Sequence, residues 1–244
     1  MRMIKKSVSV LLVLTMIVTL FTMIPIQASA ETGQRVSYKY RFWDTNQVRE
    51  CVTFQDNVQP LSSCQNNHSL SGWYYLDKSF EVGDRVTVSD EAHIILTAGY
   101  TATFKRGIRV ASGKELNLYP NENNDNGKLI ANGYDYGAAI GSNDEDDGDE
   151  SSAGTINIYG GNITALGTSD AAGIGGGNEA SGGTVRIYGG FVTANGGQYA
   201  AGIGGGDECS GGDIYVYGGT VKANGGQDGA GIGGGEDGSG GTYN

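Results

Sequence analysis

The sequence is poor in the residues that most often carry catalysis or cross-links. It has two histidines, three cysteines and three prolines among 244 residues. No apolar run after residue 30 is long enough to span a membrane. The glycine-rich half also lacks the i, i+3, i+4, i+7 apolar spacing of an amphipathic helix, and each glycine in a helix would cost about 1 kcal/mol. These absences disfavour a helical domain and leave an all-β fold.

Basic residues are scarce in the second half of the chain. Residues 133–244 carry two basic and 15 acidic residues, and the net charge of the whole chain is −11. A surface this acidic repels phosphate backbones and polyuronate chains. Nucleic acid and anionic polysaccharide are therefore poor ligands for this half of the protein.

What the sequence does have is a 29-residue repeat between residues 155 and 242. Tyr159, Tyr188 and Tyr217 keep this step, and so do the three isoleucines of the Ala-Gly-Ile-Gly-Gly-Gly phrases at 174, 203 and 232. A fixed period of this size indicates a stacked-repeat architecture. Stacking is needed because one repeat cannot bury its own apolar edge.

Within one repeat the apolar residues lie two apart, in three short stretches separated by glycine turns. Ile156 and Ile158 form the first pair, Ile163 and Ala165 the second, and Ala172 and Ile174 the third. Period two is typical of strands. Three strands per repeat predict an all-β parallel β-helix with 29-residue coils; a flat or sandwich-like sheet is the alternative.

Residues 1–30 are predicted to be a secretory signal peptide. They combine a basic start, an apolar run from Val8 to Ile26 and the small-residue site Ala28-Ser29-Ala30. The alternative is an uncleaved membrane anchor, because the apolar run is long. Cleavage would give an extracellular protein, secreted or on the cell surface, with no membrane span and a net charge of −14.

Residues 31–70 are predicted to form a β-rich cap, with strands at 36–42 and 48–54 joined by a turn at Asp44-Thr45-Asn46. In an exported protein Cys51 and Cys64 are candidates for a disulfide worth about 3 kcal/mol. The alternative is two unpaired thiols. Cys209 is left over, and it is either a cross-linking site or an incidental residue at an exposed turn.

Residues 71–244 are predicted to form the β-helix, with regular coils from about residue 154. Ile94/Leu96, Leu116/Leu118 and Ile156/Ile158 look like successive first strands, 22 and 40 residues apart, and this places Tyr119 in the tyrosine column. The last residues fall where another coil should start, without a polar capping repeat. We therefore expect a fragment of a longer protein, or an end that another segment covers.

The first candidate site is an acidic ladder, formed by the turn residues Asn178-Glu179, Asp207-Glu208 and Glu236-Asp237, which share a register in the repeat. Stacked carboxylates repel one another, so either the turns point into water or cations such as calcium lie among them. The run from Asn143 to Glu150 resembles the start of a calcium loop, but Gly154 stands where an EF-hand needs its glutamate. The candidate calcium ligands are Asp144, Asp146, Glu179, Asp207, Glu208, Glu236 and Asp237.

The tyrosine column is the second candidate site. If Ile156 and Ile158 point inward, Tyr159 points outward, and Tyr119, Tyr159, Tyr188 and Tyr217 form an exposed aromatic stripe. Aromatic faces beside polar groups are surfaces on which sugar rings dock. The alternative is a stacking ladder that adds only stability.

Catalytic motifs are not found. His68 and His93 lie outside the repeat and in no nucleophile motif, and carboxylates are too many for one pair to indicate glycoside hydrolysis. Few basic residues are present to stabilise an enolate as a polysaccharide lyase must.

The signal peptide, Gly72-Trp73-Tyr74-Tyr75-Leu76 and the Gly-Gly-Thr-Val-Arg-Ile-Tyr-Gly-Gly and Ala-Gly-Ile-Gly-Gly-Gly phrases resemble the Gly-rich β-helix region of secreted surface proteins from Gram-positive gut bacteria. That region is similar in architecture to pectin-lyase-like right-handed β-helices. The resemblance covers about residues 70–244 and implies the fold. The catalytic Asp/Arg/Lys groupings of the enzymatic β-helices have no matching positions in this sequence.

We therefore expect a non-enzymatic surface protein, an adhesive stalk or spacer that contacts glycans or other host or bacterial surface components. A polysaccharide-degrading enzyme is the alternative.

Overall fold

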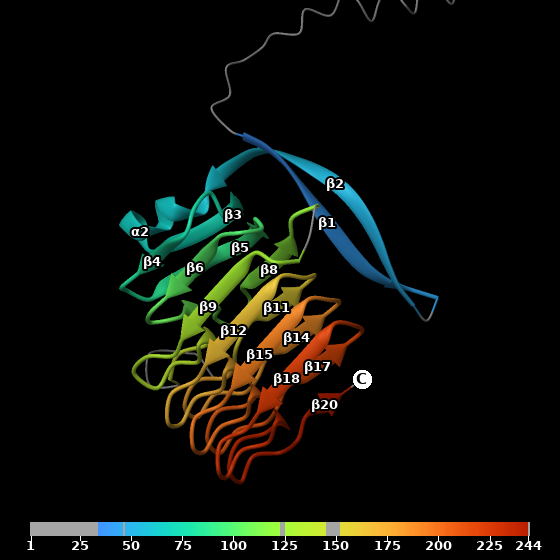
Figure 1. Cartoon of the computed structure of the whole chain (residues 1–244). Helices are drawn as coiled ribbons and strands as arrows, with labels where there is room; N and C mark the ends of the chain where they lie inside the picture. Colours follow the sequence, from blue (N-terminus) through green and yellow to red (C-terminus); the bar gives the residue numbers. More distant parts are fainter. Residues whose placement is uncertain (1–33, 46, 123–124, 145–151, 244) are drawn as a thin grey trace, which may run out of the picture. The chain divides into compact units, whose positions relative to one another are not determined.

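The computed structural model describes residues 34–45, 47–122, 125–144 and 152–243. The predicted signal peptide lies outside these residues. The described residues that follow an N-terminal hairpin wind into stacked coils, and each regular coil contributes one strand to each of three parallel ladders (Figure 1). The fold is thus an all-β parallel β-helix, as the repeat predicts.

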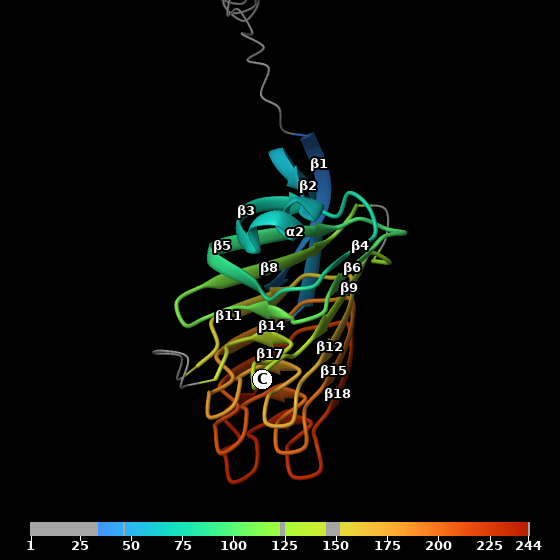
Figure 2. The same ribbon diagram turned by 90° about the vertical axis from the view of Figure 1, so that its left-hand side faces the viewer.

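The first ladder begins with β3 (Ser69–Tyr75) and β5 (Val86–Leu96) and continues through β8 (Glu115–Pro120), β11 (Thr155–Ile158), β14 (Thr184–Ile187), β17 (Asp213–Val216) and β20 (Thr242–Tyr243). The second runs through β4 (Phe80–Val82), β6 (Thr101–Phe104), β9 (Lys128–Asn132), β12 (Asn162–Leu166), β15 (Phe191–Asn195) and β18 (Thr220–Asn224). The third, joined to the first by the start of β5, contains β7 (Ile108–Arg109), β10 (Ile140–Gly141), β13 (Ile174–Gly175), β16 (Ile203–Gly204) and β19 (Ile232–Gly233). Figure 2 shows the first and second ladders on opposite sides of the stack.

Strand register confirms the 29-residue coil. Ile156 pairs with Val185, and Val185 pairs with Ile214, always in parallel. The 40-residue step is also confirmed, because Leu116 pairs with Ile156. The 22-residue step is wrong: Ala92, not Ile94, pairs with Leu116, a step of 24. The reason is that β5 is a long strand whose buried face continues to Leu96, so its largest aliphatic residues do not mark the start of the coil.

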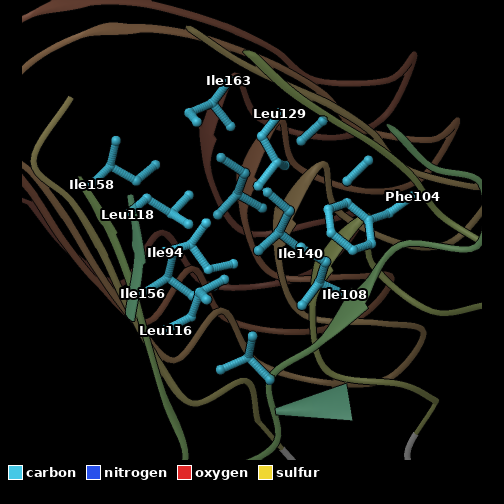
Figure 3. Close-up of a cluster of buried hydrophobic side chains, with 14 of the residues drawn as sticks. Ile94, Phe104, Ile108, Leu116, Leu118, Leu129, Ile140, Ile156, Ile158 and Ile163 are labelled. Atoms are coloured by element: carbon cyan, nitrogen blue, oxygen red, sulfur yellow. The ribbon is translucent and has the colours of Figure 1, made fainter. Parts of the chain in front are cut away.

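The core lies inside the coils. Ile94, Leu118 and Ile158 project inward from the first ladder toward Leu129 and Ile163 of the second, and all five are fully buried (Figure 3). In-register stacking places aliphatic side chains directly above aliphatic side chains. The alternation of buried and partly exposed positions along β12 and β14 follows from the two-residue strand period.

Glycine is required where the third ladder turns. Gly175 has φ +132°, and a Cβ atom there would overlap the carbonyl oxygen of Gly204 in the next coil. Side chains rarely adopt this backbone conformation. The equivalent glycines at 141, 204 and 233 share the same positive φ, so the Ile-Gly phrase is a requirement of close coil stacking.

An antiparallel hairpin precedes the coils. It consists of β1 (Gln34–Asp44) and β2 (Gln47–Pro60), joined at Thr45, which has φ +43°. A 3₁₀ turn, η1 (Leu61–Ser63), and a one-turn helix, α2 (Cys64–Asn67), lead from the hairpin into β3. Both strands contain the ranges that the sequence predicts, and Thr45 lies in a turn as predicted, whereas Asp44 belongs to β1 and Asn46 lies outside the described residues.

The predicted disulfide is not formed. Cys51 and Cys64 are both free thiols. Cys51 is exposed on β2, where its thiol donates to the Tyr40 carbonyl oxygen over 3.7 Å, whereas Cys64, the first residue of α2, is buried in the core. Burial raises the pKa of Cys64 to about 12, so this thiol stays protonated and unreactive. Sequence proximity suggested the pair, but the two side chains occupy different environments.

Substituting Gly175 tests the stacking requirement. Gly175→Ala should lower the free energy of unfolding by more than about 2 kcal/mol, because the new methyl group meets backbone atoms and the φ is unfavourable. Gly83→Ala is the matched control, since a Cβ there meets nothing within 4 Å and its φ is ordinary. Urea unfolding followed by circular dichroism measures both, and equal stability of the two variants would contradict the explanation.

Candidate functional site

The four tyrosines form a continuous stack on the outer face of the first ladder. Successive ring centroids of Tyr119, Tyr159, Tyr188 and Tyr217 are 4.7, 5.1 and 4.9 Å apart, with interplanar angles of 4°, 9° and 23°. The spacing equals the separation of strands in a sheet, so the stack follows directly from the register. We call these four residues the tyrosine column.

The hairpin lies beside the first ladder (Figure 1) and covers the first half of the tyrosine column with its own aromatic rings. The Tyr38 ring lies 4.7 Å from Tyr119, and the Tyr40 ring lies 4.9 Å from Tyr159. Tyr119 and Tyr159 are consequently only 4% and 7% exposed. Burial raises the pKa of each of these two phenols well above the usual range for tyrosine. The prediction of a wholly exposed stripe is therefore wrong for these two residues. Tyr188 and Tyr217 remain partly exposed.

Arg41 fastens the hairpin to the coils. Its Nη1 atom donates to the carbonyl oxygen of Tyr159 over 2.8 Å, its Nη2 atom to both carboxylate oxygens of Asp125 over 3.0 and 3.2 Å, and its Nε atom to Glu50 over 2.8 Å. A Cβ at Gly189 would lie 2.6 Å from Arg41 Nη1. The Gly-Gly turns after the tyrosines thus make room for the guanidinium group.

An open groove of about 630 Å³ lies where the hairpin tip meets the last coils. We call it the aromatic groove. Its lining residues are Arg41, Trp43, Gln47, Val48, Asp125, Tyr188, Gly189, Gly190, Phe191, Tyr217, Gly218, Gly219 and Thr220. Trp43 and Tyr217 stack on each other with centroids 5.2 Å apart, and Trp43 and Phe191 are 45% and 53% exposed.

The aromatic groove is suited to amphipathic rings. Its volume falls within the range of small-molecule sites, about 300–1,000 Å³. Trp43, Tyr217 and Phe191 offer flat apolar surface, while Gln47, Thr220 and Asp125 stand beside them as hydrogen-bonding groups. This is the combination that the tyrosine column suggested, but it is confined to the last two tyrosines and completed by the hairpin.

A polar cluster lies at the other end of the tyrosine column. His93 stacks on Trp73 at 4.1 Å, its Nδ1 lies 3.2 Å from the Tyr119 hydroxyl, and its Nε2 lies 3.1 Å from Glu91. Burial lowers the pKa of His93, against the opposing effect of the Glu91 and Glu115 carboxylates. The imidazole therefore stays neutral at pH 7 and packs as part of the aromatic layer.

The acidic ladder is in register, and calcium binding along it stays a prediction. Glu179, Glu208 and Asp237 each have a left-handed backbone and are exposed, so their side chains extend from the turns into water. Within the described ranges, no group of three or more His, Cys, Asp or Glu side chains is placed to hold a metal ion. Asp207 and Glu236 stand beside these residues and are partly exposed. Asp146 lies outside the described residues, so calcium binding near Asp144 and Asp146 stays a prediction.

Sequence reasoning missed the hairpin's contribution to the site, namely Arg41 and Trp43, and also Phe191. One indication was available. Tyr38, Tyr40 and Phe42 alternate on one strand of a predicted hairpin that is too short to bury them by itself. An aromatic strand face of this kind needs an apolar surface elsewhere, and the tyrosine column is that surface.

Comparison with known proteins identifies the repeat. A family model described as beta helix repeat matches residues 156–178, 185–207 and 214–236, the three regular coils. Curated proteins and solved structures give no match. The regular coils are thus β-helix repeats. Among its described residues, no helix has the length and apolarity needed to cross a membrane.

Neutralising Asp207 tests the electrostatics of the acidic turns. Burial, followed by the charges of Asp170, Glu208 and Asp237, raises the pKa of Asp207 in the folded state, although the Glu208 N–H opposes the shift. A raised carboxyl pKa means that the folded state binds more protons, so stability falls as pH rises from the unfolded value, about 3.9, through the folded value. Asp207→Asn should therefore raise Tm at pH 7, and the gain should shrink toward pH 4.

Asp90→Asn, at an exposed position of β5, is the control for a simple change in net charge. Differential scanning calorimetry in low and high salt measures both variants. A Tm of Asp207→Asn equal to or below that of the unsubstituted protein at pH 7 would contradict the proposed repulsion.

Proposed function

We propose that this protein is a non-enzymatic, extracellular β-helix protein that contacts glycans through the aromatic groove. The observation that carries the proposal is the groove itself, in which Trp43, Tyr217 and Phe191 present exposed ring surface beside hydrogen-bonding side chains. Sugar rings have apolar C–H faces and polar edges, and such a surface complements both.

The rest of the molecule supports a role as a carrier for this site. The regular coils repeat the same strands and turns, which makes the β-helix an extended and stiff scaffold. The acidic turns keep such a scaffold soluble and repel anionic surfaces. The predicted signal peptide would deliver the protein outside the cell, to glycans of host or bacterial surfaces.

The ion pair of Asp125 in the aromatic groove favours glycan binding over glycan hydrolysis. Among the described lining residues the carboxylate is Asp125, and Arg41 holds it in an ion pair at 3.0 Å. A glycosidase needs two carboxyl groups, one of them able to donate a proton. A single ion-paired carboxylate does not meet that requirement.

Removing the ring surfaces tests the proposed site. The full chain, expressed with export and purified after secretion, is screened on a glycan array, and hits are measured by isothermal titration. Trp43→Ala and Tyr217→Ala should each weaken binding by about tenfold or more, since losing a central aromatic contact typically costs more than 1 kcal/mol. Tyr100→Ala removes an exposed ring outside the groove and should bind normally.

Two results would contradict the proposal. Absence of binding across the array would remove the glycan role and leave a spacer, and equal loss in the Tyr100 control would show that the groove is not the site. The enzymatic alternative predicts release of reducing ends or unsaturated sugars from the bound glycans on prolonged incubation. Such release would replace the binding role with a catalytic one.

A further inference from the structure

The charge balance of the aromatic groove determines which glycans it accepts. Among the described residues that line it, the cation is Arg41. Arg41 is surrounded by acceptors: Glu50 at Nε, Asp125 at Nη2 and the Tyr159 carbonyl at Nη1. Its side chain is only 12% exposed. The guanidinium group is therefore fully engaged within the protein, and little of its surface faces the groove.

Two carboxylates, Glu50 and Asp125, surround Arg41. Lys39 also approaches Glu50 at 3.1 Å, so both cations are already paired within the protein. The remaining lining consists of aromatic rings, a valine, glycines, Gln47 and Thr220. A carboxylated sugar entering the groove would meet Asp125 before it met an available cation, and like charges at close range repel.

Resting on the proposed function, we infer that the aromatic groove is selective for uncharged polysaccharide chains and excludes uronate chains. The ligand class is a neutral glycan whose sugar rings carry equatorial hydroxyls, because such rings present flat C–H faces to Trp43, Tyr217 and Phe191. The amide of Gln47 and the hydroxyl of Thr220 are the groups able to bond its hydroxyls. Arg41 is a positioning residue that holds the hairpin wall of the groove, and Asp125 and Glu50 keep its charge from anionic ligands.

The experiment compares hexasaccharides of different charge. Isothermal titration of the full secreted chain uses a cello- or xylo-hexaose as the neutral ligand, hexagalacturonate as the anionic one and a chitosan hexamer as the cationic one. We expect binding of a neutral hexamer that changes less than twofold between 50 and 500 mM NaCl, because no charge is involved. Hexagalacturonate should bind at least tenfold more weakly.

A charge variant tests the cause of the selectivity. Asp125→Asn removes one of the two carboxylates that neutralise Arg41, and it should increase affinity for hexagalacturonate at least threefold at low salt. Asp56→Asn is the matched control: it removes the same charge from the hairpin, but from an exposed pair with Arg35 outside the groove. It should leave hexagalacturonate binding unchanged. Circular dichroism and Tm show whether each variant is folded, and should Asp125→Asn fail to fold, Glu50→Gln replaces it.

The outcomes separate this inference from the proposed function. Tighter binding of hexagalacturonate or of the chitosan hexamer than of the neutral ligands would overturn the selectivity but keep the glycan role. An unchanged affinity in folded Asp125→Asn and Glu50→Gln would overturn the assignment to Arg41. Failure of every hexamer and every array glycan to bind would overturn the proposed function itself.

Discussion

The structure depends on parallel, in-register stacking of coils that are all 29 residues long in the regular region. This constraint places Ile156 against Val185 and Ile214 inside, and Tyr159 against Tyr188 and Tyr217 outside. It also forces backbone against backbone at the corners, which is why Gly175 and Gly204 cannot carry side chains. The repeated sequence thus creates both the buried core and an outer aromatic surface whose exposure to water is unfavourable.

The hairpin uses that surface. Tyr38 packs edge-on and Tyr40 at a tilt against the tyrosine column, and each such aromatic pair is worth about 0.5–1.5 kcal/mol beyond its buried area. Arg41 adds charged hydrogen bonds across the same contact. The tip of the hairpin reaches the last coils, where Trp43 stacks on Tyr217, yet Tyr188 and Tyr217 stay partly exposed there. The aromatic groove therefore lies between the hairpin tip and these coils.

Much of this fold could be predicted from periodicity, because in stacked coils the spacing of equivalent residues along the sequence equals the length of one coil. The β-helix follows from spacing. The 40-residue step and the place of Tyr119 in the column follow from the match of Leu116-Asn117-Leu118-Tyr119 to Ile156-Asn157-Ile158-Tyr159. The step from Ile94 failed, since an irregular coil has no repeat to fix its start. Of the aromatic groove, only the tyrosines could be predicted. No local sequence pattern links Arg41 to Tyr159, 118 residues away, or brings Trp43 to Tyr217. Likewise, the spacing of Cys51 and Cys64 does not reveal that one thiol is exposed and the other buried.

In the proposed role, the hairpin tip and the last coils form one binding surface. Trp43 reports on it directly, because it belongs to the hairpin, is 45% exposed and stacks on Tyr217. In a Trp73→Phe background its fluorescence is the sole tryptophan emission, and acrylamide quenching measures its accessibility. If the sugar binds in the aromatic groove, a saturating neutral hexasaccharide will protect Trp43 from acrylamide and shift its emission to the blue. Unchanged quenching of Trp43 while the same sugar is demonstrably bound would place the binding site elsewhere and contradict the proposed role of the groove.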